Sequence, residues 1–349
     1  MHKQNGSVII IVLWTSILLT ILVTVMAGKI QLSARTAFHN QLAVNSLADT
    51  ASAMNKAEME LMLERMTRPI DEPLNLDDEG NNRSSALRFN GQPLTLHYPA
   101  GEDMVVRIYD HAGKINLNRI RRRDLQQLIE KQMGEDIDNQ KVQELLSAWT
   151  DWTDLNDLAG INGAEDEYYQ SLDIPYTARN YAQLDSVEEL LLIRGFDEIF
   201  GHVNLNAAFT IYGNTQTVNL NLASREAMSL LPGLNDELIE EIIAYRQERD
   251  FRSKGDVGEL VPVENFVELS NWIGSNTSNF FTVFAYPKPK AVAEDDEGLD
   301  AEEIDKQLDP STQAHMEIWE VRSYANRARV YLVNPYGRLP DIAPARVPE

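Results

Sequence analysis

The sequence contains no cysteine. This absence excludes disulfide bonds, cysteine-ligated zinc and a cysteine nucleophile. Basic residues are also scarce, because 31 Lys and Arg stand against 54 Asp and Glu and leave a formal net charge of −23. Binding to nucleic-acid phosphates needs clustered Lys and Arg, so this charge argues against a nucleic-acid partner. The many carboxylates instead favour a hard cation as a ligand.

Motifs of common catalytic sites are missing as well. The sequence has no nucleophile-elbow pattern and no Gly-rich phosphate loop, and its six histidines are too scattered to form a close metal pair. We therefore expect a protein that is not an enzyme, with its histidines at the surface or at caps. One enzymatic alternative is a calcium-dependent envelope hydrolase that uses paired carboxylates such as Asp151 and Asp154, and it would have to show turnover on a substrate.

Charged side chains are absent from Ser7 to Gly28. This apolar run is long enough to cross a bilayer, for which about 20 residues suffice. The polar leader before it holds Lys3, and positive charge favours the cytoplasmic side of a membrane. We therefore expect one membrane-spanning helix, with its amino terminus in the cytoplasm and everything after Lys29 in the periplasm.

The leader, residues 1–6, ends in Gly6 directly before the apolar run. A secretory signal peptide instead places its small residues after the apolar region, where cleavage occurs. Cleavage after Gly6 would make Ser7 the new amino terminus and would keep the apolar helix on the mature protein. The alternative is an ordinary membrane anchor that happens to follow a glycine.

The rest of the chain changes pattern twice. Good helix formers without proline predict one helix over residues 7–65, which Pro69 and Pro73 then break. Strand patterns, a long helical stretch and further strand patterns follow, an order that predicts an α+β fold with an all-α domain inserted into an antiparallel sheet. The expected segments are a leader at 1–6, a membrane span at 7–28, its helical continuation at 29–65, the first part of the sheet at 66–118, the inserted domain at 119–279, and the second part of the sheet at 280–349.

An acidic loop interrupts the second part of the sheet. Residues 293–310 hold nine acids, one Lys and no aromatic residue, so we expect a mobile, solvated loop. Asn326 is expected at the turn of the final strand hairpin.

A repeat within the helical region resembles paired helix-hairpin-helix units. Gly195 follows Ser186 by nine residues, with Glu189 at the capping-box position, and Gly233 follows Ser224 by nine residues. In many families such hairpins bind DNA phosphates through backbone amides at a helix amino terminus. Here acids follow Gly233, at residues 235–241, so packing or protein contact is favoured and a membrane-anchored protein of DNA uptake is the alternative. Salt-dependent DNA retention would discriminate the two.

Carboxylates crowd around a glycine-containing loop between Asp151 and Tyr169. Ca²⁺ takes about six to eight oxygen ligands on flexible loops, and like-charged carboxylates repel one another unless a cation neutralises them. The spacing differs from that of an EF-hand, and the alternative is a solvated acidic loop. The candidate metal ligands are Asp151, Asp154, Asp157, Glu165 and Asp166.

The amino-terminal pattern resembles that of type IV pilins and type II secretion pseudopilins, whose prepilin peptidase cuts after such a glycine. Most of these proteins have Glu at the fifth mature position, where this chain has Ile11. The minor pseudopilin K family lacks that Glu, and its most characteristic segment is similar to three stretches here. These are Asp151-Trp152-Thr153-Asp154, Gly163-Ala164-Glu165-Asp166-Glu167-Tyr168-Tyr169, and Asp173-Ile174-Pro175-Tyr176 with Arg179-Asn180.

The resemblance to the pseudopilin K family implies a pilin-like fold, in which a long amino-terminal helix lies on an antiparallel sheet and a helical domain with SAM-like units is inserted. It implies a structural Ca²⁺, processing between Gly6 and Ser7 with N-methylation, and a place in the inner membrane. It also implies a subunit that starts and caps the pseudopilus tip with the minor pseudopilins I and J. Asn156-Asp157 and the acidic loop at 293–310 depart from the family pattern and leave the ligand set open.

Overall fold

The computed structural model describes residues 7–65, 89–94, 104–134, 137–288, 313–322 and 327–340. Gly6, Pro69, Pro73, the acidic loop at 293–310 and the expected turn at Asn326 lie outside these ranges. The chain divides into two compact units, Met1–Ser52 and Ala53–Glu349. Each unit is described by itself below.

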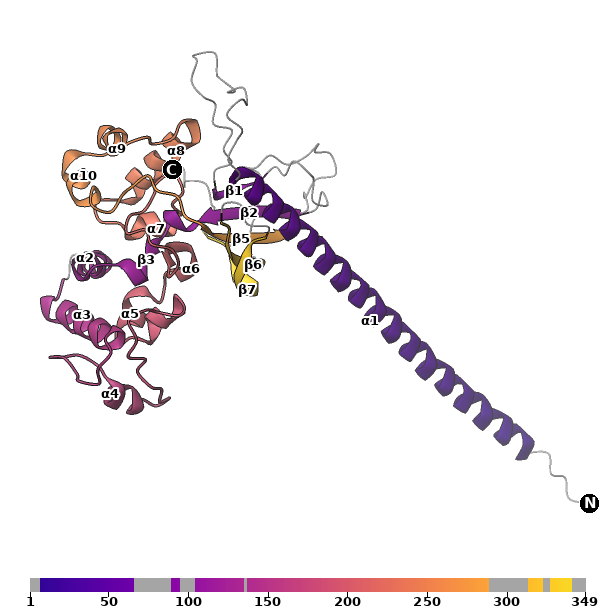
Figure 1. Cartoon of the computed structure of the whole chain (residues 1–349). Helices are drawn as coiled ribbons and strands as arrows, with labels where there is room; N and C mark the ends of the chain where they lie inside the picture. Colours follow the sequence, from indigo (N-terminus) through magenta and orange to yellow (C-terminus); the bar gives the residue numbers. More distant parts are fainter. Residues whose placement is uncertain are drawn as a thin grey trace, which may run out of the picture. The chain divides into compact units, whose positions relative to one another are not determined.

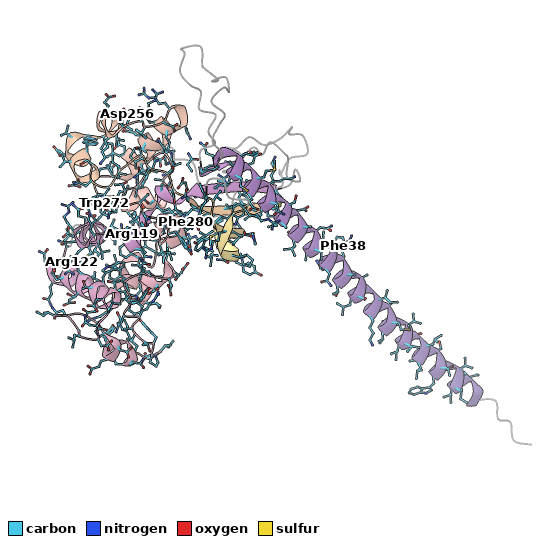
Figure 2. The ribbon with its side chains drawn as sticks, viewed as in Figure 1. Phe38, Arg119, Arg122, Asp256, Trp272 and Phe280 are labelled. Carbon is cyan, nitrogen blue, oxygen red and sulfur yellow. The ribbon has the colours of Figure 1, made fainter. Side chains whose placement is uncertain are left out.

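Helix α1 (Ser7–Arg65) supplies the described part of the first unit. Its large apolar side chains from Ile9 to Met26 are exposed, and the labelled Phe38 further along is exposed as well (Figure 2). Among the described helices, it is long and apolar enough to cross a membrane. Its threonine hydroxyls donate to the helix's own carbonyls, as Thr20 does to Ser16 O and Thr24 to Thr20 O, at 2.8 Å each. Such back-bonding leaves no hydroxyl proton unsatisfied in an apolar medium.

The second unit contains a five-stranded antiparallel sheet in the order β1-β2-β5-β6-β7. The strands are β1 (Asn90–Pro93), β2 (Met104–Asp110), β5 (Phe280–Pro287), β6 (Gln313–Glu320) and β7 (Arg329–Arg338). Asp110, the last residue of β2, pairs with Phe281 at the start of β5. The chain therefore leaves and re-enters the sheet at adjacent positions, which lets a large domain be inserted between two paired strands (Figure 1).

The end of α1 packs on this sheet. Ala53, Met54, Ala57 and Leu61 are buried against sheet residues such as Val283. The small alanines let the helix backbone approach the strands closely, and the bulky Met54 and Leu61 fill the gaps between strand side chains. This arrangement, together with the helical insertion, confirms the predicted α+β, pilin-like fold class.

The insertion is mainly helical. Its elements are η1 (His111–Gly113), β3 (Ile115–Asn116), η2 (Leu117–Arg119), α2 (Arg122–Met133), α3 (Asn139–Thr153), α4 (Asp166–Gln170), η3 (Glu188–Leu192), α5 (Phe196–Phe200), α6 (Leu205–Ala208), β4 (Phe209–Thr210), α7 (Arg225–Leu230), α8 (Asp236–Glu248), α9 (Lys254–Leu260) and α10 (Val263–Leu269). The sequence predicts an all-α insertion, and the structure adds one short pair of parallel strands, β3 and β4.

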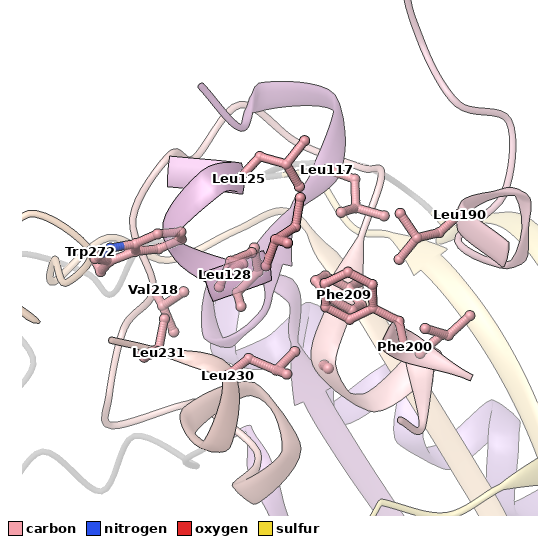
Figure 3. Close-up of a cluster of buried hydrophobic side chains, with 14 of the residues drawn as sticks. Leu117, Leu125, Leu128, Leu190, Phe200, Phe209, Val218, Leu230, Leu231 and Trp272 are labelled. Carbon is pink, nitrogen blue, oxygen red and sulfur yellow. The ribbon is translucent and has the colours of Figure 1, made fainter. Parts of the chain in front are cut away.

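One hydrophobic core joins the early and late helices of the insertion. Figure 3 shows side chains from α2, α5, β4, α7 and the segment before β5 gathered in it. The labelled residues include Leu125, Leu128, Phe200, Phe209, Leu230, Leu231 and Trp272. Because both helical repeats contribute to this core, we treat the insertion as one folding unit.

Two buried basic side chains connect the insertion to the sheet. His111 lies between two hydroxyls, with Nδ1 2.7 Å from Thr210 Oγ1 and Nε2 2.8 Å from Thr282 Oγ1. Lys114 Nζ donates to Asn206 O at 2.7 Å and to Thr282 Oγ1 at 2.8 Å. Our expectation that every histidine lies at the surface or at a cap is therefore wrong for His111, which is 2% exposed.

Burial of Lys114 predicts a pH-dependent stability. Burial lowers the pKa of its ammonium from 10.5 to about 7, with Glu226 and Asp110 opposing the shift. Between these two values the unfolded chain binds more protons than the folded one, so the free energy of unfolding should rise with pH from about 7 to about 10. The rise should reach a few kcal/mol, at about 1.4 kcal/mol per pKa unit. Chemical unfolding of the full-length protein in detergent, measured at several pH values between about 7 and about 10, gives this free energy of unfolding.

Lys114→Met should flatten the rise, because the replaced side chain cannot titrate. Lys141→Met is the matched control, since Lys141 is a partly exposed lysine of α3 that pairs with Glu198 at 2.9 Å. An unchanged slope in Lys114→Met would contradict the assignment of the pH effect to this ammonium group.

Candidate functional site

The end of α3 and the loop that follows it form the candidate site. Asp151, in the last turn of α3, is 3% exposed, and its carboxylate accepts from Gly160 N at 3.0 and 3.2 Å. A Cβ added to Gly163 would lie 1.8 Å from Asp151 Oδ2, and one added to Gly160 would lie 2.9 Å from Oδ1. Glycine at 163 therefore lets the loop fold back over the carboxylate, and a side chain at 160 would require the Asp151 carboxylate to shift.

Glu165, directly before α4, completes the cluster. It is 5% exposed, and both of its carboxylate oxygens are buried without a hydrogen-bond partner. Burial, and to a smaller degree repulsion by Asp151, Asp154 and Asp157, raises the pKa of its carboxyl group to about 7, against a smaller lowering effect of the Asn180 side chain. The fold thus brings three of the predicted ligands, Asp151, Asp154 and Asp157, near enough to Glu165 to act on its carboxylate electrostatically. We call Asp151, Asp154, Asp157 and Glu165 the carboxylate cluster.

Asp166 takes a different place. It begins α4, and its Oδ1 accepts from Ala178 N at 2.9 Å. The structure therefore does not bring Asp166 into the carboxylate cluster, although the sequence predicts it as a ligand. Its hydrogen bond instead fixes the start of α4 against the segment at 176–180.

The other two members of the carboxylate cluster, Asp154 and Asp157, each accept a hydrogen bond. Asp154 Oδ1 accepts from Asn156 N at 3.1 Å, and Asp157 Oδ1 accepts from Asn180 Nδ2. Within the described ranges, no group of three or more His, Cys, Asp or Glu side chains is close enough to hold a metal ion as it stands. The donor set nonetheless fits a hard cation, because Glu165 carries a buried, unpartnered carboxylate that faces three further acids.

An aromatic cluster packs against the end of α3. Trp152 is 1% exposed and packs edge-on against Tyr169 of α4, with ring centroids 5.0 Å apart. Tyr176 contacts both rings, at 6.3 Å from Trp152 and 5.1 Å from Tyr169. These contacts hold α3, α4 and the segment after α4 together beneath the carboxylates.

The second hairpin, Leu231-Pro232-Gly233-Leu234, is covered. Gly233 has a φ of +79°, and a Cβ there would lie 2.3 Å from the carbonyl oxygen of Asn265 in α10. Lys131 of α2 donates to Leu231 O at 2.5 Å and Leu234 O at 2.6 Å. Since protein groups already pack against this hairpin and acids begin α8, the arrangement favours internal packing over phosphate binding.

The first repeat differs from its predicted form. Ser224 caps α7, as its hydroxyl accepts from Ala227 N at 3.1 Å. The corresponding Ser186 caps nothing, because the chain forms the 3-10 helix η3 with Val187 as its uncapped start. The predicted capping box of Ser186 and Glu189 is therefore wrong, and the Glu189 carboxylate binds other partners.

One part of the chain is similar to a known protein family. Residues 113–200 match the family model described as "Type II secretion system (T2SS), protein K". This range holds η2, α2 to α5 and the whole carboxylate cluster, and it confirms the family resemblance of the sequence.

Among solved structures, the chain is similar to one in the GspK-GspI-GspJ complex from the enterotoxigenic Escherichia coli type 2 secretion system. The identity is 15%, the match covers 86% of this chain and 98% of that chain, and the TM-score is 0.49. The comparison with curated proteins finds no match.

Proposed function

We propose that this chain, a member of the type II secretion system protein K family, is a minor pseudopilin of the pseudopilus tip. It helps to start and cap the fibre that serves export of folded proteins across the outer membrane. The observation that carries the proposal is the match of residues 113–200 to protein K, within an insertion between β2 and β5 of a sheet that packs on α1.

The inserted domain supports the assignment to the tip. A second pilin-like subunit would have to stack on the head, and an insertion of more than 150 residues between Asp110 and Phe280 obstructs such stacking. Ile11 contributes in the same direction, because it stands where most pilins and pseudopilins have the Glu that meets the amino terminus of a neighbouring subunit. The role is structural rather than catalytic.

The amino-terminal helix anchors the protein. A single apolar helix fits a single-pass membrane component of the secretion system. We infer from Lys3 in the leader that the amino terminus faces the cytoplasm and that the head lies in the periplasm, with the helix in the inner membrane. The partners that follow from the family are the minor pseudopilins I and J, and the prepilin peptidase as the processing enzyme.

A structural Ca²⁺ is part of the proposal. Asp151, Asp154, Asp157 and Glu165 would hold it, and the unpartnered buried carboxylate of Glu165 supports the assignment. When bound, the ion neutralises the repulsion among these carboxylates. The chain's own contribution is to hold the end of α3, the glycine loop and the start of α4 close together, so that few residues need to be ordered on binding.

Processing of the leader tests the pilin-class assignment. Ser7 is the first helical residue of α1, and Gly6 precedes it. The mature protein should begin at Ser7 with an N-methyl group, and Gly6→Leu should block cleavage because the peptidase requires a small residue there. Mass spectrometry of the amino terminus provides the measurement.

Gly28→Leu is the control for processing, since a Cβ at Gly28 has nothing within 4 Å and the residue lies at the far end of the apolar run from the leader. It should leave cleavage unchanged. An intact Met1 in the wild-type protein, or cleavage near Gly28, would contradict the proposal.

A further inference from the structure

Glu189 of η3 is a buried carboxylate with a full set of donors. It is 8% exposed. Its Oε1 accepts from Trp152 Nε1 at 2.9 Å, and its Oε2 accepts from Arg179 Nη1 at 2.6 Å and from Asp185 N at 2.8 Å. A buried carboxylate is costly unless it is paired and hydrogen-bonded, and Glu189 meets both conditions.

Two of these donors adjoin the carboxylate cluster along the chain. Trp152 directly follows Asp151 on α3. Arg179 directly precedes Asn180, whose side-chain amide donates to Asp157. Glu189 therefore hydrogen-bonds to Trp152, the neighbour of Asp151, and to Arg179, the neighbour of the Asn180 that binds Asp157.

The negative charge of Glu189 is paired with Arg179, which is not a member of the carboxylate cluster. Arg179 also pairs with Asp185 at 2.6 Å, so one guanidinium serves two carboxylates. Both oxygens of Glu189 accept from these donors, and its negative charge is paired with Arg179. Glu189 thus braces the two segments with a charge that already has a partner.

We propose that Glu189 is a positioning residue for the carboxylate cluster, which fixes the end of α3 against the segment at 178–180 so that Asp151 and Asp157 are held ready for a divalent cation. The inference rests on the calcium site proposed above. A residue that orients metal ligands through hydrogen bonds typically changes metal affinity by about 10- to 100-fold when it is replaced.

The test is calcium titration of the full-length protein in detergent by isothermal titration calorimetry, at a temperature where every variant is folded. Glu189→Gln keeps the size of the side chain but loses its charge and one acceptor. Its Kd for Ca²⁺ should rise about tenfold, although no proposed ligand is changed. Arg179→Met, at a residue whose side chain is 22% exposed, should shift the Kd in the same direction with less risk to folding.

Glu320→Gln is the matched control. Glu320 is another buried carboxylate that accepts from an arginine and an aromatic side chain, namely Arg322 and Tyr331, but it lies on β6. It should lower the melting temperature without changing the Kd. A merely structural role for Glu189 would likewise lower the melting temperature and leave the Kd unchanged.

The outcomes separate the two proposals. Wild-type binding with a raised Kd in Glu189→Gln and Arg179→Met supports the positioning role. Wild-type binding with an unchanged Kd in both variants overturns the positioning role and leaves the calcium site standing. An absence of calcium binding in the wild-type protein overturns the calcium site and the positioning role together.

Discussion

Replacing Trp152 with alanine should lower the free energy of unfolding by about 4 kcal/mol, within the range of large-to-small changes of buried aromatic residues. Trp152 is almost fully buried, its ring packs on Tyr169 and Tyr176, and its indole nitrogen donates to Glu189. Alanine would leave a cavity beneath the carboxylate cluster and an unpaired oxygen on Glu189. Urea unfolding of the full-length protein in detergent gives the value.

Trp152→Phe separates packing from hydrogen bonding. It keeps most of the ring contacts and loses only the indole N–H, so it should cost about 1–2 kcal/mol. A loss below about 1 kcal/mol in Trp152→Ala would contradict the view that this aromatic cluster holds α3 to α4.

Calcium should stabilise the protein. The effect of Glu165→Gln on the melting temperature should change sign between chelator and calcium. If Ca²⁺ binds the folded state alone, the gain is about 2.7 kcal/mol at a hundredfold excess over Kd. In chelator near pH 8, Glu165→Gln should melt above the wild type, because the wild type buries a carboxylate against three others. In excess calcium the variant should melt at a lower temperature than the wild type, because the amide of Gln does not carry the negative charge with which Glu165 binds the ion.

Asp166→Asn is the control for this reversal. Asn keeps an acceptor for Ala178 N, so the start of α4 should remain fixed and most of the calcium gain should be retained. Thermal melts of the three proteins in both conditions test the prediction. Identical wild-type melting curves with calcium and with chelator would contradict the proposed calcium site.

The sequence is informative where the signal is local. The absence of proline and of charge predicts α1, and the change from strand to helical periodicity predicts the insertion. Spacing along the chain likewise predicts that Asp151, Asp154 and Asp157 lie near one another, because they follow within seven residues at the end of α3 and in the loop after it. Asp166 shows the limit of this reasoning, since one residue after Glu165 its carboxylate points to Ala178 instead.

The contacts that sequence could not predict are made over long separations. His111 hydrogen-bonds to residues 99 and 171 positions away, so its type and neighbours give no sign of burial. Glu189 fits a local capping box by pattern, yet its hydrogen-bond partners include Trp152, 37 positions away. The strands β3 and β4 have two residues each, too few to show any periodicity.

Assembly with the two partner pseudopilins tests the central claim most directly. Full-length protein should be coexpressed with the minor pseudopilins I and J of the same secretion system, purified in detergent through a tag on this chain, and passed over a size-exclusion column. We expect a complex with one copy of each partner, and no filament from this chain alone. Elution of the chain without either partner, together with salt-dependent retention on DNA, would contradict the claim and favour a role in DNA uptake.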